Sequence, residues 1–402
     1  MRVLKVVQSY YPFQEKGGTA VKVRALARGL AARGHNVTVL TADLGLKARL
    51  GAQNGCSFDA KRCEWGWRST MDGVEAIYLS SVGKYRALTL NPRVIRFCRT
   101  SFDRFDLVHF YGLYDMLGPA VSRYCRRQSV PYVIEPMGMF RPIDRSFRLK
   151  ALWHRCLGRS FWHYADRIIA TSEMEQQELL EDGVAPEKLI VRYNGIETIQ
   201  DLSTGSVRFR ERWGISRGEP LIVFLGRLIP RKGADTLIDA FARACPDFGR
   251  LVIAGPEGER EYRSYLERRA TECGVRARVI FTGPLYDAEK KALLADADLF
   301  ALPSRYENFA NAAAESIAFG VPVIVTNSCG IRSLVEGQAG IVIDPDQTAL
   351  ARAIRDLIHD RALYARFQEG CRRVAQQLSW SRLSEQMEAH YNTMMAAPNG
   401  IP

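Results

Sequence analysis

The stretch 297–325 constrains the fold more than any other part of the chain, because it reads as a strand, a loop, a helix and a second strand in direct succession. A strand that returns through a helix to another strand is the repeating unit of a parallel sheet. The expected elements are a buried strand at 297–302, a loop at 303–307, a helix at 308–319 closed by Gly320, and a strand at 321–325. The rest of the chain alternates in the same way, so we predict an α/β protein with parallel sheets.

Two carboxylates stand out in this stretch. Glu307 falls where a strand passes into a helix, at the carboxyl edge of a sheet, and open α/β sheets bind ligands at that edge. Glu315 lies about two helical turns later, among alanines and other apolar residues. Burying such a carboxylate is costly unless it has a partner, such as a ligand hydroxyl. From spacing alone, two ordinary surface carboxylates remain an open alternative.

The full string resembles a known signature. Glu307, seven residues, Glu315 and then Gly320-Val321-Pro322-Val323 are similar to the motif of the retaining GT-B glycosyltransferases of family GT4, also called group 1. The resemblance implies that Glu307 contacts the donor sugar and Glu315 the nucleotide ribose. It adds donor contacts from the start of the helix, at Asn308, Phe309, Ala310 and Asn311. The family usually has Gly-Phe-Gly where this chain has Asn308-Phe309-Ala310, and the alanine narrows the room for a close phosphate contact without removing the backbone amides.

A second signature, Gly-Arg-Leu-x-x-x-Lys-Gly, occupies residues 226–233 after the strand at 221–225. Arginine can hold two oxygens of a diphosphate and lysine adds a point charge, although basic residues in a loop are more often merely solvated. The family resemblance implies that Arg227 and Lys232 neutralise the departing diphosphate. It also implies nucleotide contacts in the loops after the next two strands, at Gly255 and near the base at Leu285.

The first half of the chain carries weaker signals. Gly17 and Gly18 lie between the first strand and the first helix, where the family has a loop near the donor phosphates and the acceptor; two adjacent glycines are otherwise usually a turn. His109 ends an Asp-x-x-His string similar to one that lines the family's substrate pocket, and we keep it as a pocket candidate. The family often has a second histidine where Tyr111 stands, which puts a role of His109 in proton transfer in doubt.

Two segments of this half have open interpretations. Residues 44–72 show little periodicity and are expected to form a long loop, either a cap over the acceptor site or a surface loop. Residues 148–163 predict an amphipathic helix with Leu149, Leu152, Trp153, Cys156 and Leu157 on one face. That helix either packs its apolar face into the core or lies on an anionic bilayer, and we favour the core.

Charge is unevenly distributed along the 402 residues. The net charge is +12, and residues 1–195 hold 30 basic and 18 acidic side chains, whereas the remainder holds 26 of each. The whole excess therefore belongs to the first half, which suggests an anionic acceptor or an anionic membrane surface there. No nucleic-acid motif is present, no apolar run is long enough to span a membrane, the first residues read as a strand rather than a signal peptide, and the nine scattered cysteines fit a reducing cytoplasm.

The resemblance covers nearly the whole chain and implies a GT-B fold, with two Rossmann-like domains facing across a deep cleft. We expect an acceptor domain at 1–196, a linker at 197–206, a nucleotide-sugar domain at 207–378 and a helix at 379–402 that crosses back to the first domain. The implied activity is retaining, metal-independent glycosyl transfer without a cofactor, in the assembly of bacterial polysaccharide, lipopolysaccharide or glycolipid. We expect the protein to be cytoplasmic and peripherally bound to the cell membrane. A phosphorylase or epimerase on the same fold, or an inactive binding or docking subunit, are the alternatives. The donor nucleotide, sugar, acceptor and linkage stay open.

Overall fold

A computed structural model describes residues 1–13, 18–47, 58–85, 88–141, 151–197 and 208–396. The chain divides into two compact units, which we call the N-terminal unit (Met1–Tyr193 with Trp380–Pro402) and the C-terminal unit (Asn194–Ser379). The sequence-based boundaries at 196 and 378 lie within three residues of these divisions. Nearly all of the expected linker, 197–206, lies outside the described residues.

The N-terminal unit is built on a nine-stranded sheet in the order β11-β10-β9-β8-β1-β2-β5-β4-β3. Its strands are β1 (Arg2–Val7), β2 (Asn36–Ala42), β3 (Lys61–Cys63), β4 (Gly66–Met71), β5 (Val74–Leu79), β8 (Leu107–Tyr111), β9 (Tyr132–Glu135), β10 (Arg167–Ala170) and β11 (Leu189–Val191). The strands from β11 to β5 pair in parallel, and the chain order reverses between β1 and β8. A separate hairpin joins β6 (Gly83–Tyr85) to β7 (Leu88–Leu90).

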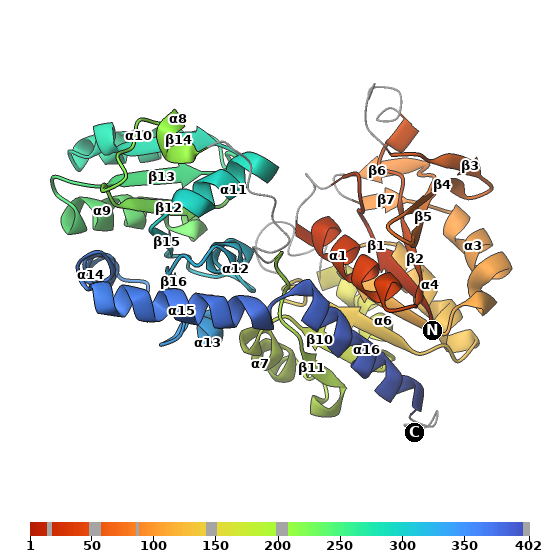
Figure 1. Cartoon of the computed structure of the whole chain (residues 1–402). Coiled ribbons are helices and arrows are strands. Elements are labelled where there is room, and N and C mark those ends of the chain that lie inside the picture. Colours follow the sequence, from red (N-terminus) through yellow and green to blue (C-terminus); the bar gives the residue numbers. More distant parts are fainter. Residues whose placement is uncertain (14–17, 48–57, 86–87, 142–150, 198–207, 397–402) are drawn as a thin grey trace. The chain divides into compact units, whose positions relative to one another are not determined.

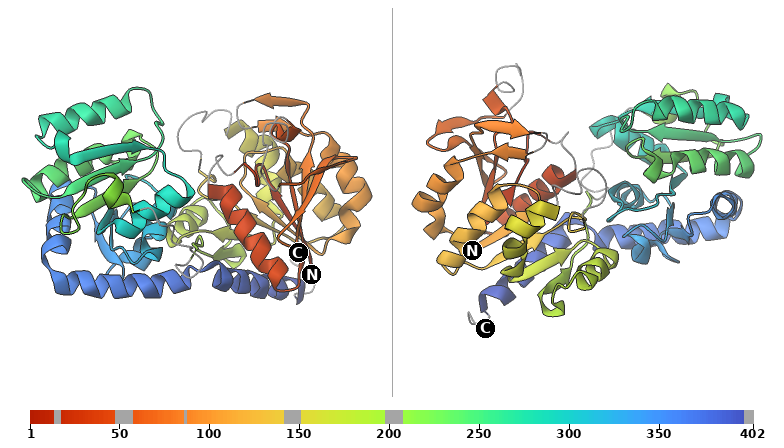
Figure 2. Two further views of the ribbon diagram at one scale, coloured as in Figure 1. Left: turned by 45° about the horizontal axis from the view of Figure 1, so that its top comes forward. Right: turned by 180° about the vertical axis from the view of Figure 1, so that it is seen from behind.

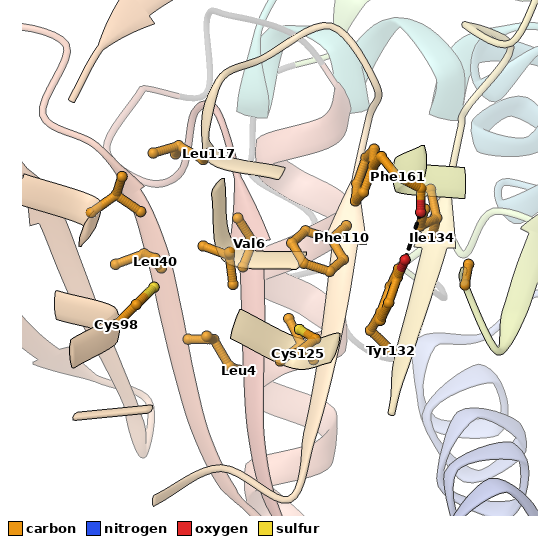
Figure 3. Packing of buried hydrophobic residues seen from close by; sticks show 14 of the residues in the cluster. Leu4, Val6, Leu40, Cys98, Phe110, Leu117, Cys125, Tyr132, Ile134 and Phe161 are labelled. Carbon is orange, nitrogen blue, oxygen red and sulfur yellow. Dashed lines mark hydrogen bonds between the residues drawn. The ribbon is translucent and has the colours of Figure 1, made fainter. Parts of the chain in front are cut away.

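Apolar side chains alternate along the central strands, and each face of the sheet therefore has its own core. Leu4, Val6 and Phe110 point to one face and pack with residues of the helices that cover it; Figure 3 shows this cluster, in which the Tyr132 hydroxyl donates a 2.7 Å hydrogen bond to the carbonyl of Phe161. The other face buries the intervening residues. The helices are α1 (Gly18–Ala32), α3 (Arg93–Ser101), η2 (Phe102–Arg104), α4 (Leu117–Arg127), η3 (His154–Gly158), α6 (Arg159–His163), α7 (Glu173–Glu181), η4 (Pro186–Lys188) and α16 (Trp380–Ala396).

The last helix, α16, belongs to the N-terminal unit although it follows the C-terminal unit in sequence. It lies beside α1, as Figures 1 and 2 show. Gly29 permits this contact, because a Cβ there would fall 2.1 Å from the Ser384 hydroxyl oxygen. The C-terminal helix therefore packs within the N-terminal unit.

The C-terminal unit contains a six-stranded parallel sheet in the order β14-β13-β12-β15-β16-β17. Numbered from its own first strand, this is the order 3-2-1-4-5-6 of a dinucleotide-binding sheet. The elements are α8 (Phe209–Arg212), β12 (Leu221–Leu225), η6 (Pro230–Lys232), α9 (Ala234–Ala244), β13 (Arg250–Ala254), α10 (Tyr262–Glu272), η7 (Arg276–Arg278), β14 (Val279–Gly283), α11 (Asp287–Asp296), β15 (Leu299–Leu302), α12 (Asn311–Ala318), β16 (Val323–Thr326), α13 (Arg332–Val335), β17 (Gly340–Ile343), α14 (Gln347–His359) and α15 (Arg361–Gln377). The α/β class and parallel sheets predicted from the sequence are confirmed.

One expectation about the N-terminal unit was wrong, and a second holds only in part. The described part of 44–72 is largely not loop, because β3 and β4 form an antiparallel hairpin that extends the sheet beyond β5. Gly66 makes this possible: its φ is +150°, and a Cβ there would lie 2.2 Å from the Tyr78 carbonyl oxygen. An edge strand that is half exposed lacks the apolar periodicity by which buried strands are recognised.

The helix predicted at 148–163 also differs from its expected form. Arg148 and Leu149 lie outside the described residues, and the described part contains a π-helical turn, η3. The extra residue in such a turn rotates the following face relative to a regular helix. Cys156, within the turn, is exposed, whereas Phe161, after it, is buried. Before the turn, Leu152 is 56% exposed and Trp153 packs against the core.

Candidate active site

The candidate site lies where the strand order of the C-terminal sheet reverses. β12 and β15 are adjacent, and their connections leave to opposite sides. Open parallel sheets bind ligands at the carboxyl ends of two such strands. The segment after β12 carries Arg227 and Lys232, and the segment after β15 carries Glu307. The topology therefore brings the two sequence signatures, which are about 75 positions apart, to one edge of the sheet.

Lys232 and Glu307 form an ion pair at this edge, between the lysine Nζ and the glutamate Oε1. Their side chains are only 16% and 14% exposed. The Ser304 hydroxyl oxygen lies 3.3 Å from the same Oε1. Because Lys232 has three N–H donors, it can keep this pair and still donate to a ligand oxygen.

Gly233 is the reason that the two segments can approach each other. Its φ is +72°, and a Cβ there would lie 2.3 Å from the Pro303 carbonyl oxygen. A hydrogen bond of 2.9 Å from the Arg305 amide to the Arg231 carbonyl joins the same two segments. The glycine after Lys232 thus permits the close backbone contact that places Lys232 beside Glu307.

Replacing Gly233 with alanine is expected to lower the free energy of unfolding of the C-terminal unit by about 2–5 kcal/mol, from the left-handed backbone and from overpacking against Pro303. Gly274 is a matched control, since its φ is +70° but nothing lies within 4 Å of a Cβ placed there. Gly274→Ala should cost only the backbone term, about 1–2 kcal/mol. Chemical denaturation of the two variants measures the difference, and equal losses would contradict the role of the contact with Pro303.

The backbone of Glu307 is held by the segment that follows β16. Its amide donates to the Ser328 carbonyl at 3.0 Å, and its own carbonyl accepts from the Gly330 amide at 2.9 Å. The Thr326 hydroxyl donates to the Ser304 carbonyl at 2.5 Å. The backbone of Glu307 is therefore held through both its amide and its carbonyl before any ligand binds.

The helix α12 begins at Asn311, three residues later than expected, because Ala310 interrupts the helical backbone with a φ of +72°. A left-handed alanine costs about 1–2 kcal/mol, and this is the position where the family usually has glycine. No side chain caps the helix, which leaves its first amides available to an anion. Phe309 and Ala310 are buried, Asn308 is half-buried, and Asn311 is exposed and accepts a 2.8 Å bond from the Asn194 side-chain amide.

Arg227 is exposed, and Gly255 lies against the backbone of the preceding residue, Gly226. A Cβ on Gly255, whose φ is +153°, would fall 1.8 Å from the Gly226 carbonyl oxygen. The Gly255 amide in turn donates to the Gly283 carbonyl at 2.9 Å. The ends of β12, β13 and β14 are thus joined through this glycine, and half-buried Leu285 follows in the next segment.

Glu315 has a protein partner that the sequence did not indicate. Lys290 Nζ, on α11, lies 2.9 Å from both of its carboxylate oxygens. The Glu315 side chain is 36% exposed, so the helix does not bury it as its apolar neighbours suggested. Ser304 and Lys290 are the side chains at the two glutamates that sequence reasoning missed; a serine in a loop and a lysine in a charged helix carry no distinguishing signal.

The site residues that the sequence predicted in the N-terminal unit are Gly17, Gly18 and His109. Gly18 is exposed and is the first residue of α1, whereas Gly17 lies outside the described residues. His109 is fully buried: its Nδ1 lies 2.6 Å from the Tyr391 hydroxyl of α16 and 3.2 Å from that of Tyr111. Burial, with the charges of Lys5, Arg192 and Lys22, holds the pKa of His109 well below its ordinary value. This neutral, enclosed histidine argues against the substrate-pocket role predicted for it.

Around His109 lies a cluster of buried charged groups, which we call the buried network: Lys5, Lys22, His109, Glu135 and Arg192. Glu135 Oε1 pairs with Lys22, and its Oε2 accepts a 2.5 Å bond from Arg192 Nη2. Lys5 donates to the Tyr111 hydroxyl at 2.6 Å, and burial lowers its pKa. The groups come from five separate parts of the sequence, and the network occupies the strand-order reversal between β1 and β8.

The described residues present no evident candidate for metal ligation. Within the described ranges, no group of three or more His, Cys, Asp or Glu side chains is placed to hold a metal ion. An Asp-x-Asp string, a pattern that could hold a metal ion, occurs at Asp296 and Asp298. These two carboxylates instead accept hydrogen bonds from Arg210, at the opposite edge of the sheet from Glu307. In a second such string, Asp346 caps α14 through the Ala349 amide. None of the described helices is long and apolar enough to cross a membrane.

Comparison with known proteins bears on the whole chain. Residues 17–195 match the family model of the glycosyl transferase 4-like domain, and residues 207–374 match that of the glycosyl transferases group 1. A relative named only by its class, the uncharacterized glycosyltransferase MJ1607 of Methanocaldococcus jannaschii, is 25% identical over 405 residues, with 96% of both chains covered.

Two further proteins are similar over different lengths. The GDP-mannose-dependent alpha-(1-6)-phosphatidylinositol dimannoside mannosyltransferase of Mycobacterium tuberculosis is 35% identical over 191 residues, which cover 46% of this chain and 47% of that one. The solved structure of Anabaena Alr3699/HepE in complex with UDP and glucose has a TM-score of 0.73 and 22% identity, covering 98% of this chain and all of that one. The fold is therefore the GT-B fold, and with both of its domains matched by glycosyltransferase models the chain belongs to the group 1 glycosyltransferases.

Proposed function

We propose that this glycosyltransferase binds a nucleotide-diphosphate sugar in its C-terminal unit and transfers the sugar, with retention and without a metal ion, to a hydroxyl of an acceptor bound by its N-terminal unit. The observation that carries the proposal is the Lys232–Glu307 ion pair at the strand-order reversal, with Arg227 exposed in the same segment as Lys232. Together they supply two cations for a diphosphate and one carboxylate for a sugar hydroxyl.

The roles follow from where charge develops during transfer. Breaking the bond between sugar and phosphate leaves negative charge on the diphosphate, and preorganised cations and amides stabilise that charge most effectively. Arg227, Lys232 and the first amides of α12 serve this purpose in the proposed mechanism. Glu307 orients the sugar and Glu315 the ribose. No side chain is assigned as a nucleophile, and the donor phosphate helps to accept the acceptor's proton.

The first test is a thermal-shift screen against UDP, GDP, ADP and their sugars in the presence of EDTA. A nucleotide present at about 100 times its Kd should stabilise the native state by about 2.7 kcal/mol and raise the midpoint by about 5–10 °C. Lys232→Ala should abolish most of that shift. If no nucleotide raises the midpoint, the donor site is wrong and the inactive-subunit alternative gains weight.

The acceptor is proposed to be a saccharide or a lipid-linked saccharide of bacterial polysaccharide, lipopolysaccharide or glycolipid assembly. Support comes from the similar mannosyltransferase, whose name specifies a phosphatidylinositol dimannoside. Once a donor is found, the anomeric proton coupling of the product tests retention directly. Product with inverted configuration would exclude the retaining mechanism.

The basic and apolar side chains on one described face of the N-terminal unit support binding to an anionic membrane. Helices α3, α4 and the segment 151–163 lie side by side on one face of the sheet and together contain no acidic residue. Their exposed arginines, which we call the basic layer, are Arg93, Arg96, Arg99, Arg123, Arg126, Arg127, Arg155 and Arg159. Ile95 and Leu152 are 46% and 56% exposed among them. Basic and apolar side chains on one face are typical of peripheral binding to acidic lipids, so we propose association with the inner face of the cell membrane.

Vesicle sedimentation tests the basic layer. The protein should bind vesicles that contain anionic lipid, bind neutral vesicles poorly, and lose binding as salt rises. Arg123→Glu with Arg126→Glu should weaken binding at least about tenfold, because each basic residue near the surface contributes about 1 kcal/mol. Arg352→Glu with Arg355→Glu on α14 changes the net charge equally and should leave binding unchanged. Equal binding to neutral and anionic vesicles would contradict the proposal.

A further inference from the structure

Lys290 joins two parts of the C-terminal unit that the proposed donor site uses. It lies in the first turn of α11, five residues after Leu285, in the segment expected near the base. Its Nζ contacts both carboxylate oxygens of Glu315, on α12, at 2.9 Å. One lysine thus connects the segment on the base side of the nucleotide to the carboxylate on its ribose side.

Two interpretations of this pair compete. Both side chains are about one-third exposed, and ion pairs at that exposure contribute little to stability. A merely structural pair would therefore be dispensable. Its location argues for more, because Glu315 is the only acidic side chain of α12, whose other residues are small or apolar apart from Asn311 and Ser316. A carboxylate on such a helix would otherwise be free to rotate among several side-chain conformations.

Contact at both oxygens fixes the plane of the carboxylate. An ionised carboxylate offers about four acceptor positions, so two remain for a pair of neighbouring hydroxyls after Lys290 has bonded to each oxygen. A ligand that meets an already ordered carboxylate avoids the entropic cost of immobilising it. The arrangement is suited to a vicinal diol, which is the part of a ribonucleotide that a deoxyribonucleotide lacks.

We propose that Lys290 is a positioning residue for the nucleotide donor, which holds Glu315 in the orientation that receives the two ribose hydroxyls of a nucleoside diphosphate. The inference rests on the proposed function, since it takes the donor to be a ribonucleotide bound at Glu315. It makes Lys290 a determinant of ribose recognition that acts through Glu315 and not through the reacting atoms.

The test measures ribose discrimination. The affinity of the best nucleoside diphosphate from the screen and of its 2′,3′-dideoxy analogue is determined by calorimetry for the wild type and for Lys290→Met. We expect Lys290→Met to lower the affinity for the ribonucleotide by about three- to tenfold and the affinity for the dideoxy analogue by less than twofold. The donor KM should rise by a similar factor, with kcat within twofold, and Lys290→Arg should recover most of the affinity.

Two controls separate this role from a structural one. Lys291→Met alters the neighbouring lysine, which pairs with Glu197 at 3.5 Å, and should leave both affinities unchanged. In a Glu315→Gln background, Lys290→Met should have no further effect on ribonucleotide binding. The inference would be overturned if Lys290→Met weakened the binding of both nucleotides equally, left the ratio of the two affinities unchanged, or lowered kcat. None of these results would contradict the donor site itself. A wild type that binds no nucleoside diphosphate would overturn the proposed function itself.

Discussion

Replacing Lys232 with alanine should lower kcat by about 10²- to 10³-fold, the loss seen when one preorganised donor to a developing negative charge is removed. Arg227→Ala should lower kcat by a factor in the same range, for the same reason. Lys232→Ala has a second consequence, because Glu307 loses the cation that orients it. The measurement is initial rate at saturating donor, with the donor that the thermal-shift screen identifies.

The matched control is Arg355→Ala, which removes an exposed cation from α14 in the same unit and should keep the wild-type rate. A Glu307→Gln variant completes a double-mutant cycle. Because Lys232 and Glu307 act on the same ligand and on each other, their combined loss should be smaller than the sum of the single losses expressed as free energies. A Lys232→Ala enzyme within threefold of the wild-type kcat would show that the diphosphate is neutralised elsewhere.

Glu135→Ala should lower the free energy of unfolding of the N-terminal unit by about 3–5 kcal/mol, because it breaks a buried ion pair by removing one partner. Arg192 is 1% exposed and keeps its charge near neutral pH, so the guanidinium would remain buried without a counter-charge. Its Nε and Nη1 already have no hydrogen-bond partner within the described residues. The loss corresponds to a fall of about 6–20 °C in the unfolding midpoint, measured by calorimetry.

Glu64→Ala is the control for this effect. Glu64 pairs with Arg96 at 3.1 Å, but both side chains are well exposed, and such pairs contribute about 1 kcal/mol or less. Replacing Lys22, Glu135 and Arg192 together with apolar residues of similar size should recover much of the loss, since the cost arises from the unpaired charge and not from the absence of the pair. Equal destabilisation by Glu64→Ala and Glu135→Ala would contradict the importance of burial.

The proposed donor site of the C-terminal unit was accessible to sequence reasoning for a physical reason. Its proposed residues lie in short segments that directly follow strands, and the carboxyl ends of parallel strands always meet at one edge of a sheet. Recognising the strands before Arg227 and Glu307 is therefore enough to place both residues at that edge. The need for a glycine after Lys232 has an equally simple physical reason, because a turn that packs against another backbone segment leaves no room for a Cβ.

The buried network could not be predicted in this way. Lys5 sits in a strand of alternating charge and apolar residues that reads as half exposed, yet its side chain is fully buried. Its neighbours are Glu135, in β9, and Arg192, directly after β11, both more than a hundred positions away. Their charges compensate each other only once the sheet and α16 have assembled. His109 was misjudged for the same reason, since a histidine at a strand end looks the same in a sequence whether it faces a ligand or a tyrosine.

The sequence by itself determined the alternation of strands and helices, the parallel sheets and the positions of the two signatures that contain Lys232 and Glu307, because each of these depends on local periodicity and on residues close together in the chain. The tertiary structure alone decided which charges are buried and which partners they have. Lys290 could reach Glu315 only after α11 and α12 had packed onto the C-terminal sheet, and α16 could enclose His109 only after returning from the C-terminal unit. Burial and long-range pairing depend on the assembled core, and no single stretch of the sequence contains that information.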